Sequence, residues 1–297
     1  MKPFKYVVIS PVKDEEKYIA QTMESVISQT VQPSEWLIVD DGSTDDTVKI
    51  IRRYAQGKDW IKVILNRRDP ARNTGVAEML AFKLGLQHIT LEDYDFIVKL
   101  DGDLRFERDY FEKILDRLNT DACLGIASGV YLEKKKGQWK VIEMPGYHAA
   151  GASKILRKPC FEQIGGFITE AGWDTVDEIR AQYLGWGTTH FKDVLFYHLK
   201  NEGSGMGYKK TNLMHGEIYY RVGGSKLFLA FKLLDRIFFS TPFLLAGFYL
   251  LVGYLRPMVE RKPLLVDVDE ARFYRAILIG RLKEKINWRI FHKGRSY

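Results

Sequence analysis

Cysteine is scarce in this chain, which has only Cys123 and Cys160 among its 297 residues. Their separation matches no metal-binding motif, and two thiols cannot form the cross-linked framework that holds small secreted domains together. We therefore expect two ordinary thiols in a reducing compartment. Hydrophobic residues make up 46% of the chain and charged residues 28%, a composition that excludes widespread disorder and allows a large core.

The sequence also lacks a recognisable secretory leader, internal repeats and low-complexity segments. Its first residues run directly into the strand-like Tyr6–Ile9, with no basic segment followed by an apolar one, so we expect a cytoplasmic start. A length of 297 residues allows one large domain with an appendage and is too short for three ordinary domains.

An excess of basic residues is missing from most of the chain and confined to its last quarter. Residues 226–297 carry 14 Lys and Arg against 6 Asp and Glu, whereas the preceding 225 residues carry 31 against 32. This distribution argues against a catalytic domain that binds nucleic acid. It favours a basic segment that lies near anionic lipid.

A long uncharged run lies inside this basic segment, over residues 237–255. Its 19 residues are about the length that a helix needs to cross a bilayer core. However, Lys and Arg flank it on both sides, whereas a single span collects them on the cytoplasmic side. We therefore expect 226–297 to be a membrane-associated helical segment, with a helix or hairpin lying in one leaflet favoured over a span. A buried pair of soluble helices is the alternative.

Apolar runs alternate with segments of helical spacing in the first 100 residues, which predicts an α/β fold with a mostly parallel central sheet and helices on both faces. Domain 1–225 would contain this sheet, and 226–297 would follow it. The predicted strands lie at 6–10, 36–39, 61–65 and 95–100, then less clearly at 123–132, 139–143 and 192–198. The predicted helices lie at 17–29, after Ser43 or Thr44 as the cap, at 76–88 and at 174–184.

Polar residues follow each of the first four predicted strands. Ligands bind outside the carboxyl ends of the strands in open α/β sheets, so these four loops should converge on one crevice. The loops begin at Pro11, Asp40, Asn66 and Asp101.

Asp101 and Asp103 come directly after a strand and are separated by one glycine. Two carboxylates at this spacing can reach a divalent cation and the diphosphate that it carries. The cation would neutralise charge on a leaving nucleoside diphosphate. Asp-Gly is also a common turn dipeptide, so a plain turn is the alternative.

Asp41 follows another strand, within Asp40-Asp41-Gly42-Ser43-Thr44-Asp45. Its carboxylate is placed to accept a hydrogen bond from a ring N–H such as the imide of uracil or guanine. The same residues also suit a strand-to-helix turn in which Asp and Ser act as caps.

Several motifs in order give the chain its resemblance to a family 2 glycosyltransferase with the GT-A fold, which is Rossmann-like and binds nucleotide-diphospho-sugars. They cover roughly the first 110 residues. They are Ser10-Pro11-Val12-Lys13-Asp14-Glu15-Glu16, Ser28-Gln29-Thr30, Val39-Asp40-Asp41-Gly42-Ser43-Thr44-Asp45, Ala71-Arg72-Asn73-Thr74-Gly75 and Asp101-Gly102-Asp103.

The resemblance implies a donor half over about 1–115 and an acceptor half over about 116–225. In the donor half, Pro11 and Glu15 would contact the nucleotide, Asp41 the base, and Arg72 the donor. Asp101 would lie near the ribose and the metal, and Asp103 would bind the metal. Where the family often has Tyr-Asn before its Glu, this chain has Lys13-Asp14, which puts a stacking contact to the base in doubt.

The acceptor half resembles the family through Gly165-Gly166-Phe167 and Trp173-Asp174, with Trp173 in place of the family's Glu. An inverting transfer needs a carboxylate that removes the acceptor hydroxyl proton, and Asp174 is the residue at that position. Asp177 and Glu178 are the rivals, because they follow at helical spacing on about the same face. Their alternative interpretation is a solvated helix face.

His198 and Lys200 follow the last predicted strand. A neutral imidazole at 198 would complete the shell of Mn²⁺ or Mg²⁺, and Lys200 would pair with the diphosphate. The Gly203–Gly207 segment would be a lid or a plain linker. The Gln-x-x-Arg-Trp motif of processive members is absent from the sequence, which indicates a single addition.

The leading hypothesis is therefore a metal-dependent, inverting sugar transferase at the cytoplasmic membrane face, acting on a lipid-linked or surface-glycan acceptor. A nucleotidyltransferase of similar fold is the second reading, although its Gly-rich opening loop is lacking. A non-catalytic membrane adaptor is the third, although the carboxylates that it would be expected to lose are present.

Overall fold

The computed structural model describes residues 4–66, 74–200, 207–239 and 244–293. Arg72 and most of the Gly203–Gly207 segment lie outside these residues. The chain folds as two compact units, Met1–Glu202 and Gly203–Tyr297. This division falls earlier than the sequence-based boundary at 225/226, because α7 (Tyr208–Arg221) packs against α9 (Leu245–Val259) in the second unit.

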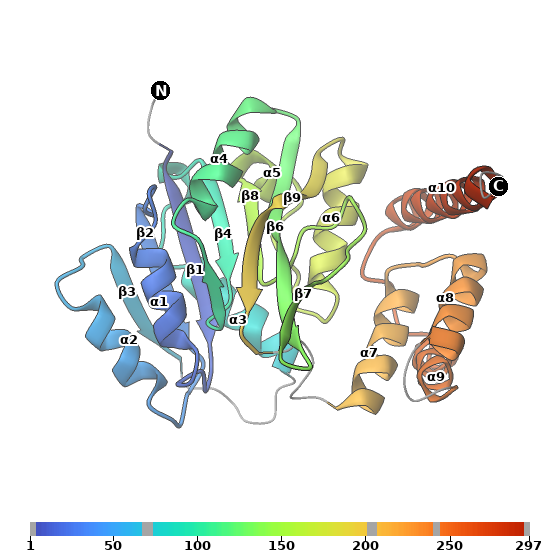
Figure 1. Ribbon diagram of the computed structural model, residues 1–297, viewed down its shortest axis with the longest axis horizontal. Helices are drawn as coiled ribbons and strands as arrows, with labels where there is room; N and C mark the ends of the chain where they lie inside the picture. The colour runs from blue at the N-terminus through green and yellow to red at the C-terminus, as the bar shows by residue number, and fades with distance from the viewer. Residues whose placement is uncertain (1–3, 67–73, 201–206, 240–243, 294–297) are drawn as a thin grey trace. The chain divides into compact units, whose positions relative to one another are not determined.

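The first unit begins with the predicted alternation of strands and helices (Figure 1). Its strands β1, β2 and β4 are buried along their whole length, which explains their continuous apolar runs. The strand β1 extends through Pro11 to Val12, beyond the predicted end. The elements are β1 (Tyr6–Val12), α1 (Ile19–Ile27), β2 (Glu35–Asp40), α2 (Thr47–Ala55), β3 (Ile61–Leu65), α3 (Thr74–Leu86), the short 3₁₀ helix η1 (Leu91–Asp93) and β4 (Phe96–Leu100).

The rest of this unit adds five strands and three helices. The predicted strand that ends at His198 is β9, and the predicted helix at 174–184 is α6. The elements are β5 (Leu104–Phe106), α4 (Tyr110–Thr120), β6 (Leu124–Lys135), β7 (Gln138–Val141), β8 (Ser153–Arg157), α5 (Lys158–Gln163), α6 (Trp173–Tyr183) and β9 (Gly187–His198).

All the strands belong to one sheet, in the order β3-β2-β1-β4-β8-β6-β9-β5, with β7 paired to β6. The β3-β2-β1-β4 half is parallel, as predicted. The other half is mixed, because β8 runs antiparallel to both β4 and β6, β7 to β6, and β5 to β9. The strands β6 and β9 run parallel. The expectation of a mostly parallel sheet therefore holds for β3-β2-β1-β4 and not for the whole sheet, since apolar runs do not encode strand direction.

Helices cover both faces of the sheet, as predicted (Figure 1). One core contains residues of α1, α2 and α4 against one face of β1, β2 and β4, and the other contains residues of α3, α5 and α6 against the opposite face. This two-sided burial fixes the strands, and with them the polar loops at their carboxyl ends.

The second unit consists of α7, α8 (Lys226–Phe239), α9 and α10 (Val268–Lys293). The helices α7 and α9 meet backbone to backbone at Gly216 and Gly253: a Cβ atom on Gly253 would stand 2.1 Å from the Leu213 carbonyl oxygen. The uncharged run 237–255 is divided between α8 and α9, with 240–243 outside the described residues. None of the helices, over their described residues, is both long and apolar enough to cross a bilayer.

Candidate active site

The loop between β4 and β5 carries the two carboxylates that follow the fourth strand. Thr22 of α1 holds this loop: its hydroxyl lies 2.8 Å from the Gly102 carbonyl oxygen and accepts the Leu104 N–H at 2.9 Å. Gly102 is tightly enclosed, because an added Cβ would stand 2.9 Å from a methyl carbon of Val12. The spacing of Asp101 and Asp103 is therefore fixed by packing as well as by sequence.

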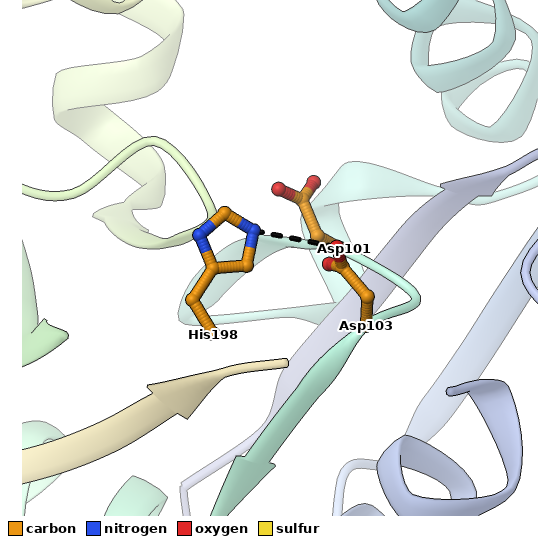
Figure 2. Close-up of side chains that lie close together, drawn as sticks. All are labelled: Asp101, Asp103 and His198. Atoms are coloured by element: carbon orange, nitrogen blue, oxygen red, sulfur yellow. Dashed lines mark ion pairs between the residues drawn. The ribbon is translucent and has the colours of Figure 1, made fainter. Parts of the chain in front are cut away.

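Asp101, Asp103 and His198 form a cluster whose potential ligand atoms all lie within 4.8 Å of one another (Figure 2). His198 lies at the end of β9, far from Asp101 and Asp103 in the sequence. It reaches the cluster because β5 and β9 pair antiparallel, with Leu104 opposite His198. His198 Nε2 lies 3.4 Å from Asp103 Oδ2. The side chains of Asp103 and His198 are 8% and 11% exposed, so both groups are largely withdrawn from water.

Burial and charge shift the protonation of this cluster. Burial alone would lower the pKa of His198, but the surrounding carboxylates, of which Asp103 contributes most, together more than offset this effect, and the pKa is raised. Burial raises the pKa of Asp101 to about 7, against the opposing effect of Lys99. The nearby Glu78 and Asp103 carboxylates raise this pKa further, and a bound cation would relieve their repulsion.

Glu15 and Lys200 border the cluster. Lys200 Nζ donates to Glu15 Oε1 at 2.8 Å, and the buried Glu15 Oε2 has no hydrogen-bond partner within the described part of the chain. Burial raises the pKa of Glu15. The side chain lies beside the loop of the cluster, since a Cβ on Gly102 would stand 3.6 Å from Glu15 Cγ. Glu15, which the resemblance linked to the nucleotide, and Lys200, proposed as a partner of the diphosphate, thus both lie at this edge.

Asp41 is also at this edge, buried at the end of β2. Its Oδ1 accepts a hydrogen bond from Asn66 Nδ2 at 2.8 Å, and its N–H donates to the Val12 carbonyl oxygen. Lys13 Nζ donates to the Gly42 carbonyl oxygen at 2.9 Å, which ties the first loop to the second. Pro11 is buried inside β1, opposite Val39.

The predicted caps Ser43 and Thr44 serve a different purpose. The helix α2 begins only at Thr47, and its N-terminal region uses the Asp45 carboxylate, which accepts the Thr47 N–H at 3.0 Å. Ser43 Oγ instead accepts the Asp14 N–H, and Thr44 N–H donates to the Asp14 carboxylate. These residues therefore join the first two strand-end loops, and the prediction that they cap the helix was wrong.

Asp174 lies in the first turn of α6 and is half-buried. A Cβ on Gly151 would stand 3.5 Å from Asp174 Cβ, and the neighbouring Ala152 carbonyl oxygen accepts the Asp101 N–H at 2.9 Å. The predicted base and the cluster are thus bridged by two consecutive residues, Gly151 and Ala152.

Asp177 and Glu178 are buried, so the alternative interpretation of a solvated helix face does not hold for them. Lys154 Nζ lies 2.9 Å from Asp177 Oδ2 and 3.2 Å from Glu178 Oε1. His148 Nδ1 lies 2.9 Å from Glu178 Oε2, and the Ala149 N–H donates to Glu178 Oε1 at 2.7 Å. Both carboxylates are engaged by the protein itself.

A family model for glycosyl transferase family 2 matches residues 7–169, which is 163 of the 297 residues. The chain belongs to glycosyl transferase family 2. This confirms the family inferred from the strand-end motifs.

Curated relatives in the family cover part of the chain. An uncharacterized protein of Methanocaldococcus jannaschii is 33% identical over 124 residues, 40% of this chain and 51% of that protein. Chondroitin synthase of Escherichia coli is 32% identical over 111 residues, 36% of this chain and 14% of that enzyme. The chain thus spans about half of the first relative and a small part of the second.

A solved structure confirms the GT-A fold. The mannosyltransferase from Pyrobaculum calidifontis in complex with GDP-Man and Mn²⁺ matches 97% of this chain and 84% of its own, with a TM-score of 0.57 and 17% identity. At this identity the likeness concerns the fold alone.

The residues at the strand ends fit the divalent cation that the GT-A fold implies. Asp101 and Asp103 offer carboxylate oxygens, and His198 offers an imidazole nitrogen. His198 Nδ1 lies 4.0 Å from Glu133 Oε1 and makes no hydrogen bond within the described residues. Such a set of donors suits Mn²⁺ or Mg²⁺ better than a softer metal, which would favour thiolates.

The sequence analysis missed two buried lysines of this family 2 member, Lys99 and Lys154. Lys99 pairs with Asp101 and with Glu78, and Lys154 pairs with the α6 carboxylates. The sequence did contain a signal for Lys99, which lies inside the apolar run of β4. A lysine is almost never fully buried unless its charge is paired, so its position there indicates a buried carboxylate partner.

Proposed function

We propose that this protein transfers a sugar from a nucleoside diphosphate donor to a glycan or lipid-linked acceptor, with inversion at the anomeric carbon. The observation that carries the proposal is the convergence of Asp101, Asp103 and His198 within 4.8 Å at the carboxyl edge of the strands. Glu15 and Lys200 border that edge and would contact the donor. Asp41 would accept a hydrogen bond from the base.

Asp103 and His198 would hold the cation, with Asp101 beside them. When bound, a divalent cation neutralises the charge that develops on the departing nucleoside diphosphate. Mg²⁺ binds almost exclusively to oxygen ligands, whereas a site that includes an imidazole suits Mn²⁺ better. We therefore propose Mn²⁺ as the preferred ion and Mg²⁺ as a weaker substitute.

Asp174 would be the general base. In the transfer, the acceptor oxygen forms a bond to the anomeric carbon, the bond from that carbon to the diphosphate oxygen breaks, and the acceptor proton passes to the Asp174 carboxylate. The rivals Asp177 and Glu178 are held by Lys154 and His148 and are nearly inaccessible. Asp174 is the half-exposed carboxylate of the three.

The test is a Mn²⁺ titration of the apoprotein together with release of nucleoside diphosphate from GDP- and UDP-sugars. Asp103→Ala should lose Mn²⁺ binding and reduce donor turnover by about 100-fold or more, since metal catalysis supplies several kcal/mol. Asp193→Ala removes an exposed carboxylate that pairs with Arg117 and serves as the control. Unchanged Mn²⁺ affinity in Asp103→Ala would contradict the proposed site.

We further propose that the second unit binds the cytoplasmic face of the cell membrane. Three exposed apolar residues follow one another along α8 at helical spacing, Leu227, Phe231 and Leu234. A second exposed group lies along α9 and includes Phe248, which is 57% exposed. Together with the 14 Lys and Arg of residues 226–297, these side chains suit a surface of anionic lipid.

Sedimentation with vesicles of mixed neutral and anionic lipid tests this surface. Phe231→Glu and Phe248→Glu should each reduce the bound fraction, because a carboxylate opposes both apolar insertion and the negative headgroups. Val141→Glu, at an exposed position of the first unit, is the matched control. Equal binding by all three variants would exclude α8 and α9 as the membrane surface.

A further inference from the structure

Lys99 is a buried cation directly behind the candidate active site. Lys99 lies inside β4 and is 1% exposed. Its Nζ forms ion pairs with the carboxylates of Asp101 and Glu78, and it lies 5.1 Å from the centre of the Trp173 ring. One ammonium group thus contacts three elements: the end of β4, the helix α3 and the helix α6.

Trp173 connects this lysine to a second one. Lys154 Nζ lies 5.3 Å from the same ring and donates to the Asp174 carbonyl oxygen at 2.9 Å. The indole therefore contacts one lysine that binds Asp101 and another that binds the backbone of Asp174. This places one cation next to Asp101, a member of the candidate metal cluster, and another next to Asp174, the proposed base.

The energetics argue that Lys99 is not there for stability. Removing an ammonium group from water costs several kcal/mol, and a buried ion pair often contributes no more to stability than apolar side chains of the same volume. Ile97, which shares a face of β4 with Lys99 and is buried in the core on that side of the sheet, shows that this face accommodates apolar side chains. What an apolar residue at position 99 would not provide is a partner for the Asp101 carboxylate.

We propose that Lys99 is a positioning residue of the site: it anchors Asp101 Oδ1 and thereby fixes the orientation of the Asp101 carboxylate in the cluster with Asp103 and His198. Glu78 shares the charge of Lys99, so that Asp101 is held without being fully neutralised. This inference rests on the proposed function, because it concerns how well the cluster binds a divalent cation.

The experiment is a titration of the apoprotein, residues 1–297, with Mn²⁺. Electron paramagnetic resonance measures the concentration of free Mn²⁺ at each point of the titration. Lys99→Met should weaken Mn²⁺ affinity by about tenfold, the effect typical of losing a partner of a ligating group. Lys154→Met is the matched control: it removes an equally buried lysine from the same indole, but one that contacts no member of the cluster. Its Mn²⁺ affinity should match that of the wild type.

Glu78→Gln keeps the inference testable if Lys99→Met does not fold, because the Glu78 side chain is 32% exposed and its replacement is nearly isosteric. Lys99 would then be left with Asp101 alone, would neutralise it more completely, and Mn²⁺ affinity should fall several-fold. Wild-type or tighter Mn²⁺ affinity in both Lys99→Met and Glu78→Gln overturns the inference. If only one of the two variants folds, the Mn²⁺ affinity of that variant decides whether the inference stands.

Asp103→Ala in the same titration separates this inference from the proposed function. Loss of Mn²⁺ binding in Asp103→Ala with wild-type affinity in the Lys99 and Glu78 variants leaves the metal site standing and removes the role of Lys99. Retained Mn²⁺ binding in Asp103→Ala removes the metal site itself.

Discussion

Two clusters in the first unit pair a histidine with carboxylates, and they differ in how completely the protein satisfies their charge. In the α6 cluster, Lys154 and His148 engage Asp177 and Glu178. In the strand-end cluster, Asp101 and Glu78 share Lys99, whereas Asp103 and Glu133 both lie near His198, whose Nδ1 has no hydrogen-bond partner within the described residues. We call the α6 cluster the closed cluster, because its charged groups are paired with one another and hold α6 in place. The strand-end cluster retains negative charge to which an external cation can bind.

The largest expected effect concerns the residue that stands between the two clusters. Asp174→Asn should lower transfer by about 1000-fold, because a positioned general base contributes 100- to 10,000-fold, while donor binding stays as in the wild type. Product formation measures the transfer rate, and calorimetry measures the affinity for the donor. Asp177→Asn is the comparison variant, and a transfer defect confined to Asp177→Asn would move the catalytic role into the closed cluster.

A smaller effect is expected from opening the closed cluster. Lys154→Met leaves two carboxylates buried without their cation and should lower the free energy of unfolding by about 3 kcal/mol. Urea unfolding measures the change, with Lys140→Met as the exposed-lysine control. A stability equal to the wild type would show that the α6 cluster does not depend on its lysine.

The smallest effect is a pH dependence in the closed cluster. Burial alone would lower the pKa of His148, but the Glu178 carboxylate more than offsets it, so the folded pKa is raised. The stabilisation from this pair is therefore fully present below the unfolded pKa of about 6.5 and is lost as the pH rises through the folded value. Lys154 and Asp174 also face the imidazole and act in opposite directions.

We expect His148→Asn to cost about 1 kcal/mol at pH 5.5 and less at pH 8.5, in urea unfolding at both pH values. His190→Asn is the control, because its imidazole binds the His148 carbonyl oxygen and no carboxylate. A cost that is equal at both pH values, or larger at pH 8.5, would contradict the raised pKa.

The sequence predicted the alternating elements of the donor half because strands buried on both faces leave continuous apolar runs. It also predicted that Asp41 and Asp101 follow such strands, and parallel topology brings these ends to one edge. The strand β8 was not predicted, and its antiparallel direction was not predictable either, since an apolar run reads the same in either direction. The burial of Asp177 and Glu178 was missed because their partner Lys154 lies in another element, so α6 alone looks like a polar face.

The meeting of His198 with Asp101 and Asp103 depends on the pairing of β5 with β9, which no local pattern encodes. Asp101 and Asp103 were proposed by resemblance to the family, and His198 by its place after a predicted strand; the structure brings the three side chains together. Their roles as ligands stay predictions until the Mn²⁺ titration is done. Arg72, also proposed by resemblance, lies outside the described residues.

The enclosed Gly102 limits how this site can be redesigned. Any side chain at the middle position of the Asp-x-Asp motif would collide with Val12 on β1 and approach Ile19 on α1. Motif variants with a larger middle residue, transplanted into this scaffold, would displace the loop unless position 12 or 19 became smaller at the same time. Positions 12, 19 and 102 would therefore have to be substituted together. A library that varies all three at once should contain folded variants that single substitutions cannot give.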